Sequence, residues 1–329
     1  MIDKKQFLVN VRCATYNHSA YIEDAMNGFA MQQTDFPFVC SIIDDASTDG
    51  EQEILKKYLD KNFELGEGSG VINEETDDYV LTLAQHKTNK NCYFAVLFLK
   101  YNHYGTSESK ARRWTYLKEW EDECKYIALC EGDDYWTDPL KLQKQVDFLE
   151  KHKDYAMCFH NAAAKNETDT VFELIRVENR DYNIQELFDK WISPTASLVI
   201  KNDVNSKLPF DSRIINGDIN IVLNACNHGR VYGMSDAMSV YRVHNNGLTL
   251  KRSRENPIGL ALNYVGHYKA LGRLYPQIRN LAIRNITDVY ISISLSLFKK
   301  NPLKSALYLI RAICTSPSRV ATRIVKYLR

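Results

Sequence analysis

The chain has 329 residues, of which 45% are hydrophobic and 25% charged, and its formal net charge is +1. This composition predicts a globular protein with a substantial core, and the small net charge argues against a general nucleic-acid-binding surface. The eight cysteines form no Cys-x-x-Cys pair, and several lie in apolar runs, so we expect reduced thiols in a reducing compartment. There is no secretory signal and no run of about 18 apolar residues, which predicts a cytoplasmic protein without a transmembrane helix.

Two strand–helix units are expected in the first 60 residues. Residues 7–16 alternate in the manner of a strand, and the apolar residues 38–43 form a second strand. A helix follows each strand, the first capped by Ser19 and the second by a capping box of Thr48 and Glu51. This order of elements predicts an α/β fold with a parallel sheet, in which the two strand ends lie side by side.

Side chains at these two strand ends are suited to recognise a nucleoside. The ring of Tyr16 can stack on a base, and the carboxylate of Asp44 or Asp45 can accept a hydrogen bond from a base N–H or a ribose hydroxyl. One aspartate can instead cap the following helix, which leaves the other for a ligand. No Gly-x-Gly-x-x-Gly follows either strand, which argues against a dinucleotide-binding site.

The next segment is polar and contains several glycines, so we expect residues 60–92 to be an insertion or a mobile loop. An apolar strand at 93–99 follows it. Residues 110–113 then read Lys-Ala-Arg-Arg and precede a helix. This basic cluster can meet a diphosphate, or it can form a solvated face of that helix.

An acidic loop between a strand and a helix is the most informative stretch. Residues 126–130 form a buried apolar strand, and a helix starts at Pro139, capped by Thr137 or Asp138. Three carboxylates lie between them: Glu131, Asp133 and Asp134. Open α/β sheets bind ligands at the carboxyl ends of their strands, and Mg²⁺ and Mn²⁺ prefer carboxylate ligands. Gly132 lets a partner approach the backbone closely; a solvated acidic turn is the alternative.

Two histidines and one aspartate further along are also candidates. His160 ends a strand and can contact a sugar, or it can be a core or capping residue. Asp218 begins a helical run, where an N-cap or first-turn acid is favourable. Short strands at 231–233 and 238–243 lead to His244.

From residue 257 onward the chain is expected to be helical. No acidic residue follows Asp288, whereas eight Lys or Arg do. An amphipathic face is formed at helical spacing by Leu303, Leu307, Ile310 and Ile313. A basic amphipathic tail can lie on an anionic membrane surface, or it can be a packed helix with a solvated basic face.

Four of these stretches resemble, in order and spacing, the motifs of family-2 glycosyltransferases of the GT-A fold, of the bacterial surface-polysaccharide type. They are Val-Arg-Cys-Ala-Thr-Tyr-Asn at 11–17, Asp-Asp-Ala-Ser-Thr-Asp-Gly at 44–50, Glu-Gly-Asp-Asp at 131–134 and Gly-Asp at 217–218. The resemblance implies a Rossmann-like, mostly parallel central sheet with flanking helices. It also implies a catalytic domain at 1–250, followed by a C-terminal helical, basic extension at 251–329.

The resemblance further implies an inverting transfer of one sugar from a nucleoside-diphosphate sugar, with a UDP-sugar expected, to a glycan or lipid-linked acceptor. Mn²⁺ or Mg²⁺ is the implied cofactor. Donor contacts would fall on Ala14, Tyr16, Asp44, Asp45, Arg112, Glu131 and Gly132. Asp133 would bind the metal, His244 would contact the metal or the diphosphate from a closing loop, and Asp218 would be the general base.

Two departures from the family pattern keep other functions open. Glu131 stands where the family usually has Asp, and residues 111–113 match its Ala-Arg-Asn element only in part. A non-catalytic nucleotide-sugar-binding scaffold is therefore one alternative, although the intact Asp133 and Asp218 argue against it. A nucleotidyltransferase is another, but residues 14–17 lack the glycine and lysine of a phosphate loop. The Gln-x-x-Arg-Trp pattern of processive members is absent, which predicts addition of a single sugar.

Overall fold

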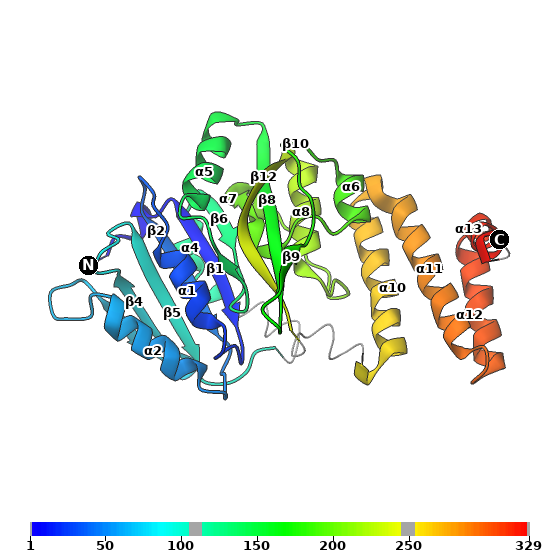
Figure 1. Ribbon diagram of the computed structural model, residues 1–329, viewed down its shortest axis with the longest axis horizontal. Helices are drawn as coiled ribbons and strands as arrows, with labels where there is room; N and C mark the ends of the chain where they lie inside the picture. The colour runs from blue at the N-terminus through cyan, green and yellow to red at the C-terminus, as the bar shows by residue number, and fades with distance from the viewer. Residues whose placement is uncertain (1, 105–113, 245–253, 328–329) are drawn as a thin grey trace. The chain divides into compact units, whose positions relative to one another are not determined.

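The computed structural model describes residues 2–104, 114–244 and 254–327, which form two compact units (Figure 1). The first unit carries a twelve-stranded sheet, counted over the described residues, and the second is built from helices. Among the described helices, none combines the length and the apolar character needed to cross a membrane.

The sheet of the first unit is mixed, with four neighbouring parallel strands at its centre and both parallel and antiparallel pairs towards its margins. Its hydrogen-bonded order is β10 (Arg180–Asp181), β12 (Arg230–Val243), β8 (Tyr155–Asn166), β11 (Val199–Lys201), β6 (Tyr126–Leu129), β1 (Val9–Thr15), β2 (Phe38–Asp44), β5 (Cys92–Leu99), β4 (Tyr79–Gln85) and β3 (Ile72–Glu75). β7 (Tyr135–Trp136) pairs with β12, and β9 (Val171–Glu173) pairs with β8. β5, β2, β1 and β6 run parallel, whereas β11 lies antiparallel to both β6 and β8.

The helices of this unit are α1 (Ile22–Ala30), α2 (Glu51–Asn62), α4 (Lys118–Asp122), α5 (Lys141–Lys151) and α7 (Asn202–Asn205). Helices pack on the sheet through two hydrophobic clusters, one with residues of α1, α2 and α5 and the other with Trp120 of α4. Every residue of β2 and β5 is buried, as expected for parallel strands covered on both faces. The ring of Phe29 on α1 meets that of Trp136 edge-on, with centroids 4.9 Å apart. The predicted α/β fold with a mostly parallel central sheet is confirmed at the centre of this sheet.

The segment predicted to be an insertion or a mobile loop instead extends the sheet. β3 and β4 form an antiparallel hairpin, and β4 also pairs with β5. Leu81 and Leu83 are buried in one cluster with Val39 and Trp120. The charged and amide residues on either side of β4 hide its short alternation, in which Leu81 and Leu83 are buried whereas Val80 and Thr82 are partly exposed.

Two predicted helix caps are wrong because each helix begins two residues later than its predicted cap requires. Ser19 does not cap α1, which begins after Tyr21, and the Ser19 N–H donates to Asp49 at 2.9 Å. α2 begins after Gly50, whose φ of 93° lies in the left-handed region that glycine tolerates. Instead of forming the predicted capping box, the carboxylate of Glu51 accepts hydrogen bonds from the Thr15 hydroxyl at the end of β1 and from the His18 N–H in the following loop.

Two other boundaries also differ from the prediction. α5 begins two residues after Pro139, because Asp138 accepts a hydrogen bond from the N–H of Leu140 at 2.8 Å and delays the first helical turn. The two short strands expected between 231 and 243 are one strand, β12, whose pairing with β8 shifts register between Met234 and Ala237. That irregularity interrupts the alternation on which the prediction was based.

The second unit consists of α6 (Ile184–Asp189), α8 (Gly217–His228), α10 (Pro257–Leu274), α11 (Arg279–Leu297), α12 (Pro302–Thr315) and α13 (Pro317–Tyr327). Leu223 of α8 is buried in one cluster with Leu271 and Tyr275, at the end of α10. The predicted C-terminal helices are confirmed. α6 and α8 precede residue 250 but cluster with these helices, and a domain boundary at that residue stays a prediction.

Candidate functional site

Three parallel strands place their following loops at one edge of the sheet. Thr15 at the end of β1 pairs with Asp44 of β2, and the Asp45 N–H donates to the Thr15 carbonyl at 3.0 Å. On the other side of β1, the Cys130 N–H donates to the Arg12 carbonyl at 3.1 Å. The prediction that the ends of β1 and β2 lie side by side is confirmed. The acidic loop follows β6, which pairs with β1 on its other side, so this loop lies at the same edge of the sheet.

Three side chains at this edge form a possible metal site. Asp133 lies in the loop after β6, His18 in the loop after β1, and His244 directly after β12. Each can offer one ligand atom, and these atoms lie within 4.8 Å of one another. The His18 Nε2 is 3.7 Å from an Asp133 carboxylate oxygen. One carboxylate and two imidazoles form a donor set that fits a divalent transition metal.

Glu51 fixes the loop that carries His18. This buried carboxylate accepts hydrogen bonds from the Thr15 hydroxyl, from the His18 backbone N–H at 2.9 Å and from the Ser47 hydroxyl at 2.8 Å. The Thr15 hydroxyl also lies 3.2 Å from Nδ1 of His18, which leaves Nε2 directed to Asp133. A hydrogen bond to one ring nitrogen orients an imidazole so that its other nitrogen can bind a metal.

Gly132 is required by the packing of the acidic loop against β1. Its N–H donates to the Ala14 carbonyl at 3.1 Å. A Cβ at position 132 would lie 2.2 Å from the Thr15 hydroxyl oxygen and 2.6 Å from the Thr15 Cβ. The close approach expected at Gly132 is therefore made by the chain itself.

The two aspartates of the acidic loop have different surroundings. Asp134 is buried and accepts a hydrogen bond from the Arg242 N–H at 2.8 Å. Burial raises the pKa of Asp134, and the neighbouring Asp133 acts in the same direction. The Arg242 guanidinium donates to the Asp133 carbonyl at 2.8 Å, pairs with Asp24 and lies 4.4 Å from the centroid of the Tyr135 ring. Asp134 and Arg242 thus hold the loop, while Asp133 presents its side chain at the partly exposed surface.

Among the predicted nucleoside contacts, Asp44 is buried and hydrogen-bonded through one oxygen to residues of the following loop and helix, whereas Tyr16 faces solvent. Asp44 accepts hydrogen bonds from the Ser47 N–H at 3.2 Å and from the Gln52 side chain at 2.5 Å, and burial raises its pKa. Asp45 is also buried, and one of its oxygens accepts from the His103 N–H at 2.6 Å. The side chain of Tyr16 is 41% exposed, enough to offer a ring face to a ligand.

The remaining candidates lie in different surroundings. Glu131 is exposed in the acidic loop, and Arg112 lies outside the described residues. His160 is buried, its Nδ1 lies 2.8 Å from the Asn161 carbonyl, and burial lowers its pKa, as expected for the core-residue alternative. Asp218 lies in the first turn of α8, in the second unit.

The surroundings of Asp218 shift the pKa of its carboxyl group. Burial raises its pKa, while hydrogen bonds from the Ile219 backbone and the Trp191 side chain act in the opposite direction. A carboxylate with a raised pKa is a better proton acceptor than an ordinary surface aspartate. Such a group is suited to general-base chemistry.

Nothing in the local pattern singles out His18 or Arg242. Only the topology could have pointed to His18. The loops that follow neighbouring parallel strands lie at the same edge of the sheet, so a histidine after β1 can lie near an acidic residue after β6. Arg242 lies 109 residues from Asp133 along the chain, and only the pairing of β12 with β7 and β8 brings it to the acidic loop.

Comparison with known proteins gives the class to which this fold belongs. The chain superposes on S. aureus TarS residues 1–349 in complex with UDP-GlcNAc with a TM-score of 0.61 and 17% identity, covering 95% of this chain and 82% of that TarS fragment. It also matches a mannosyltransferase from Pyrobaculum calidifontis in complex with GDP-Man and Mn²⁺, with a TM-score of 0.52, 14% identity and coverage of 100% and 83%. The chain therefore has the GT-A glycosyltransferase fold that its motifs predict.

Sequence relatives agree with this fold. TuaG of Bacillus subtilis, named as a teichuronic acid biosynthesis glycosyltransferase, is 22% identical over 244 residues, which are 74% of this chain and 81% of TuaG. The uncharacterised protein Rv1520 of Mycobacterium tuberculosis is 29% identical over 238 residues. That match spans 71% of this chain but only 58% of Rv1520. No protein-family model matches the chain.

Proposed function

We propose that the protein is a metal-dependent, inverting family-2 glycosyltransferase that moves one sugar from a nucleoside-diphosphate sugar to a hydroxyl of a glycan or lipid-linked acceptor. The observation that carries the proposal is the convergence of His18, Asp133 and His244 at the carboxyl ends of the sheet strands. The GT-A fold, shared with proteins seen with UDP-GlcNAc and with GDP-Man, supports this assignment. UDP is the expected nucleotide, and an acceptor of the surface-polysaccharide class follows from the resemblance to TuaG.

The donor atoms favour Mn²⁺ over Mg²⁺. Mg²⁺ prefers oxygen ligands, whereas imidazole nitrogens suit transition metals. His18 and His244 supply two imidazoles, and Asp133 supplies the carboxylate. When bound, the cation would act as a Lewis acid that neutralises the charge of the departing diphosphate.

Side chains of the protein would bind the nucleotide sugar and remove the proton from the acceptor. In this proposal the exposed ring of Tyr16 would stack on the base, Ala14 and Asp45 would contact the nucleoside, and the exposed carboxylate of Glu131 would accept from a ribose hydroxyl. Arg112 remains the proposed diphosphate contact. Asp218 takes the proton from the acceptor hydroxyl as its oxygen attacks the anomeric carbon, and the carbon–oxygen bond to the diphosphate breaks in the same displacement, with inversion.

The test is release of nucleoside diphosphate from a panel that includes UDP-GlcNAc and GDP-mannose, with Mn²⁺, with Mg²⁺ and without metal. We expect slow turnover of one donor in Mn²⁺ and a loss of at least about 100-fold in Asp133→Ala, beyond the range for outer-shell changes. The matched control is Asp236→Asn, an exposed carboxylate of the same unit that pairs with Lys144 at 3.5 Å.

Two results would distinguish the alternatives. Metal-dependent binding of a donor without turnover, even with a polysaccharide acceptor present, would favour a scaffold. Failure of every donor to bind in calorimetry would refute the glycosyltransferase assignment.

A further inference from the structure

Most of the large aliphatic side chains of α12 point away from α11, the helix on which α12 packs. Ser305 and Ala312, seven residues apart on one face, are the buried residues of α12. Leu303, Leu307 and Ile310 lie on the opposite face and are 86%, 47% and 57% exposed. A packed helix of a globular protein normally buries its leucines and exposes its small polar residues, so this arrangement is reversed.

The end of α11 adds to this exposed surface. Leu295 and Phe298 are 52% and 67% exposed. We define the outer face as Leu295, Phe298, Leu303, Leu307, Ile310 and Ile313. Fifteen large hydrophobic residues are exposed in the described part of the chain, and seven of them, including Leu309, lie between residues 295 and 313. Such a concentration marks an interaction surface rather than scattered surface residues.

The inner side of α12 is well anchored. The hydroxyl of Ser305 donates to the Ser294 carbonyl at 2.8 Å, and the hydroxyl of Ser294 donates to the Ser305 carbonyl at 2.9 Å. This close contact, allowed by two small side chains, fixes α12 to α11. The orientation of the outer face is therefore set by packing on its opposite side.

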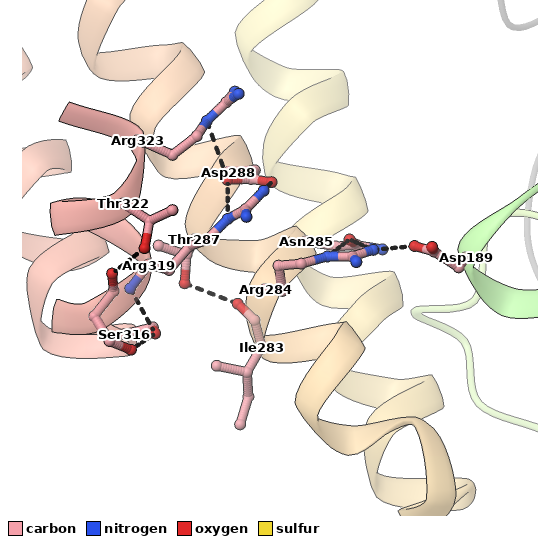
Figure 2. Close-up of polar contacts among 11 residues, drawn as sticks. Asp189, Ile283, Arg284, Asn285, Thr287, Asp288, Ser316, Arg319, Thr322 and Arg323 are labelled. Carbon is pink, nitrogen blue, oxygen red and sulfur yellow. Dashed lines mark hydrogen bonds and ion pairs between the residues drawn. The ribbon is translucent and has the colours of Figure 1, made fainter. Parts of the chain in front are cut away.

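α13 is anchored to α11 through charge. Figure 2 shows Arg319 and Arg323 reaching Asp288. Arg319 donates to both oxygens of Asp288, at 2.9 and 2.5 Å, and the Nε of Arg323 lies 3.5 Å from one of them. Asp288 is the last acidic residue of the sequence, so these two ion pairs use the only carboxylate side chain at or beyond that position.

Cations border the outer face without any acidic residue among them. Lys299 and Lys300 follow α11, and Lys304 and Arg311 lie on α12, all four exposed. On a helical projection, Lys304 and Arg311 stand together at one edge of the apolar stripe. Hydrophobic residues flanked only by cations complement a surface that is apolar inside and anionic outside.

We propose that the outer face docks the protein on an anionic lipid bilayer, with α12 lying in the interfacial plane. α12 has 14 residues, about 21 Å at 1.5 Å per residue, too short for a hydrocarbon core of about 30 Å. A second copy of the chain would bring an equally cationic border against the first, which like-charge repulsion disfavours. The inference does not rest on the proposed sugar transfer, although a lipid-linked acceptor would be met at such a surface.

The test is co-sedimentation of the full chain with vesicles of phosphatidylcholine alone or mixed with phosphatidylglycerol. We expect binding to the mixed vesicles that weakens with salt and is at least about tenfold weaker to phosphatidylcholine. Leu307→Ser/Ile310→Ser should weaken binding by at least about tenfold. Lys304→Gln/Arg311→Gln should weaken it by about 25-fold, or roughly fivefold per cation. The matched control Phe210→Ser removes a 72% exposed ring from the same unit and should bind as the wild type does.

Light scattering on the same samples tests the alternative that a second copy of the chain covers the outer face. Absence of vesicle binding, or equal binding to both lipid compositions, would overturn the proposal. Absence of vesicle binding together with self-association that Leu307→Ser/Ile310→Ser abolishes would assign the face to a contact between copies. Thermal melting of each variant checks that the protein remains folded. If Leu307→Ser/Ile310→Ser unfolds the protein, the vesicle binding of Lys304→Gln/Arg311→Gln, which changes only exposed side chains, still tests the proposal.

Discussion

Replacing Glu51 tests whether one buried carboxylate holds the metal-binding loop together. It accepts hydrogen bonds from three donors: the Thr15 hydroxyl, the His18 N–H and the Ser47 hydroxyl. A hydrogen bond to a charged group contributes about 1.5–3 kcal/mol, but the desolvation of a buried carboxylate offsets part of the sum. We expect Glu51→Ala to lower the free energy of unfolding by about 3 kcal/mol.

Glu51→Gln is the matched control, because an amide can satisfy nearly the same partners. Its carbonyl oxygen can accept from the His18 N–H and the Ser47 hydroxyl, as one carboxylate oxygen does now. Its NH₂ group can donate to the Thr15 hydroxyl oxygen, which can also accept a hydrogen bond from the Nδ1–H of His18, 3.2 Å away, so that Nε2 stays unprotonated for the metal. We therefore expect a loss of only about 1 kcal/mol.

Two measurements distinguish these variants. Urea denaturation gives the free energy of unfolding, and calorimetry with Mn²⁺ gives the metal affinity. Glu51→Ala should bind Mn²⁺ about 10–100-fold more weakly, because the His18 imidazole loses its backbone support, whereas Glu51→Gln should stay within a few-fold of the wild type. Equal stability and affinity of the two variants, or an alanine variant within 1 kcal/mol of the wild type, would refute the role assigned to Glu51.

Three further predictions concern the same fold. Gly132→Ala should cost about 1–3 kcal/mol of stability, measured by denaturation, because its Cβ would lie 2.2 Å from the Thr15 hydroxyl oxygen; unchanged stability would contradict that packing. His18→Ala should weaken Mn²⁺ binding in calorimetry by at least about tenfold with little change in Mg²⁺ binding, and an equal loss for both ions would contradict the imidazole preference. If Asp218 is the base, activity requires its ionised form, and its raised pKa places the acid limb of the kcat/KM profile above the ordinary value of 3.8. Trp191→Phe removes a hydrogen bond that lowers this pKa, so the limb should move to higher pH, and a limb that stays in place would argue against Asp218.

Local patterns were sufficient to predict most of the strands that position the site. Burial on both faces of β2 and β5 requires apolar runs, and the face of α1 follows the 3.6-residue period, so both are visible in the sequence. The order of the Asp-Asp and Glu-Gly-Asp-Asp motifs after such strands predicted the GT-A fold, which the comparisons confirm. The catalytic, donor-binding and metal-binding roles assigned to individual residues all stay predictions.

Helix caps were less predictable from the sequence because a capping side chain can hydrogen-bond to residues that only folding brings near it. The spacing of Thr48 and Glu51 fits a capping box, but folding brings Thr15 and His18 to the carboxylate of Glu51, and these partners replace the local one. Likewise, the polar composition of residues 60–92 hides β4, which becomes a strand by pairing along β5. Local propensity competes here with contacts that do not exist until the sheet forms.

The sequence by itself determined the α/β order of elements, the acidic loop after β6 and the basic, amphipathic character of the C-terminal helices. Tertiary structure alone decided which residues meet that loop: His18 arrives because β1 pairs with β6, and Arg242 arrives because β12 pairs with β7 and β8. It also decided which side of α12 is covered, because Ser305 and Ala312 allow close packing and leave the leucines outside. Periodicity shows that a helix has two faces, but only the packed neighbours determine which face is buried.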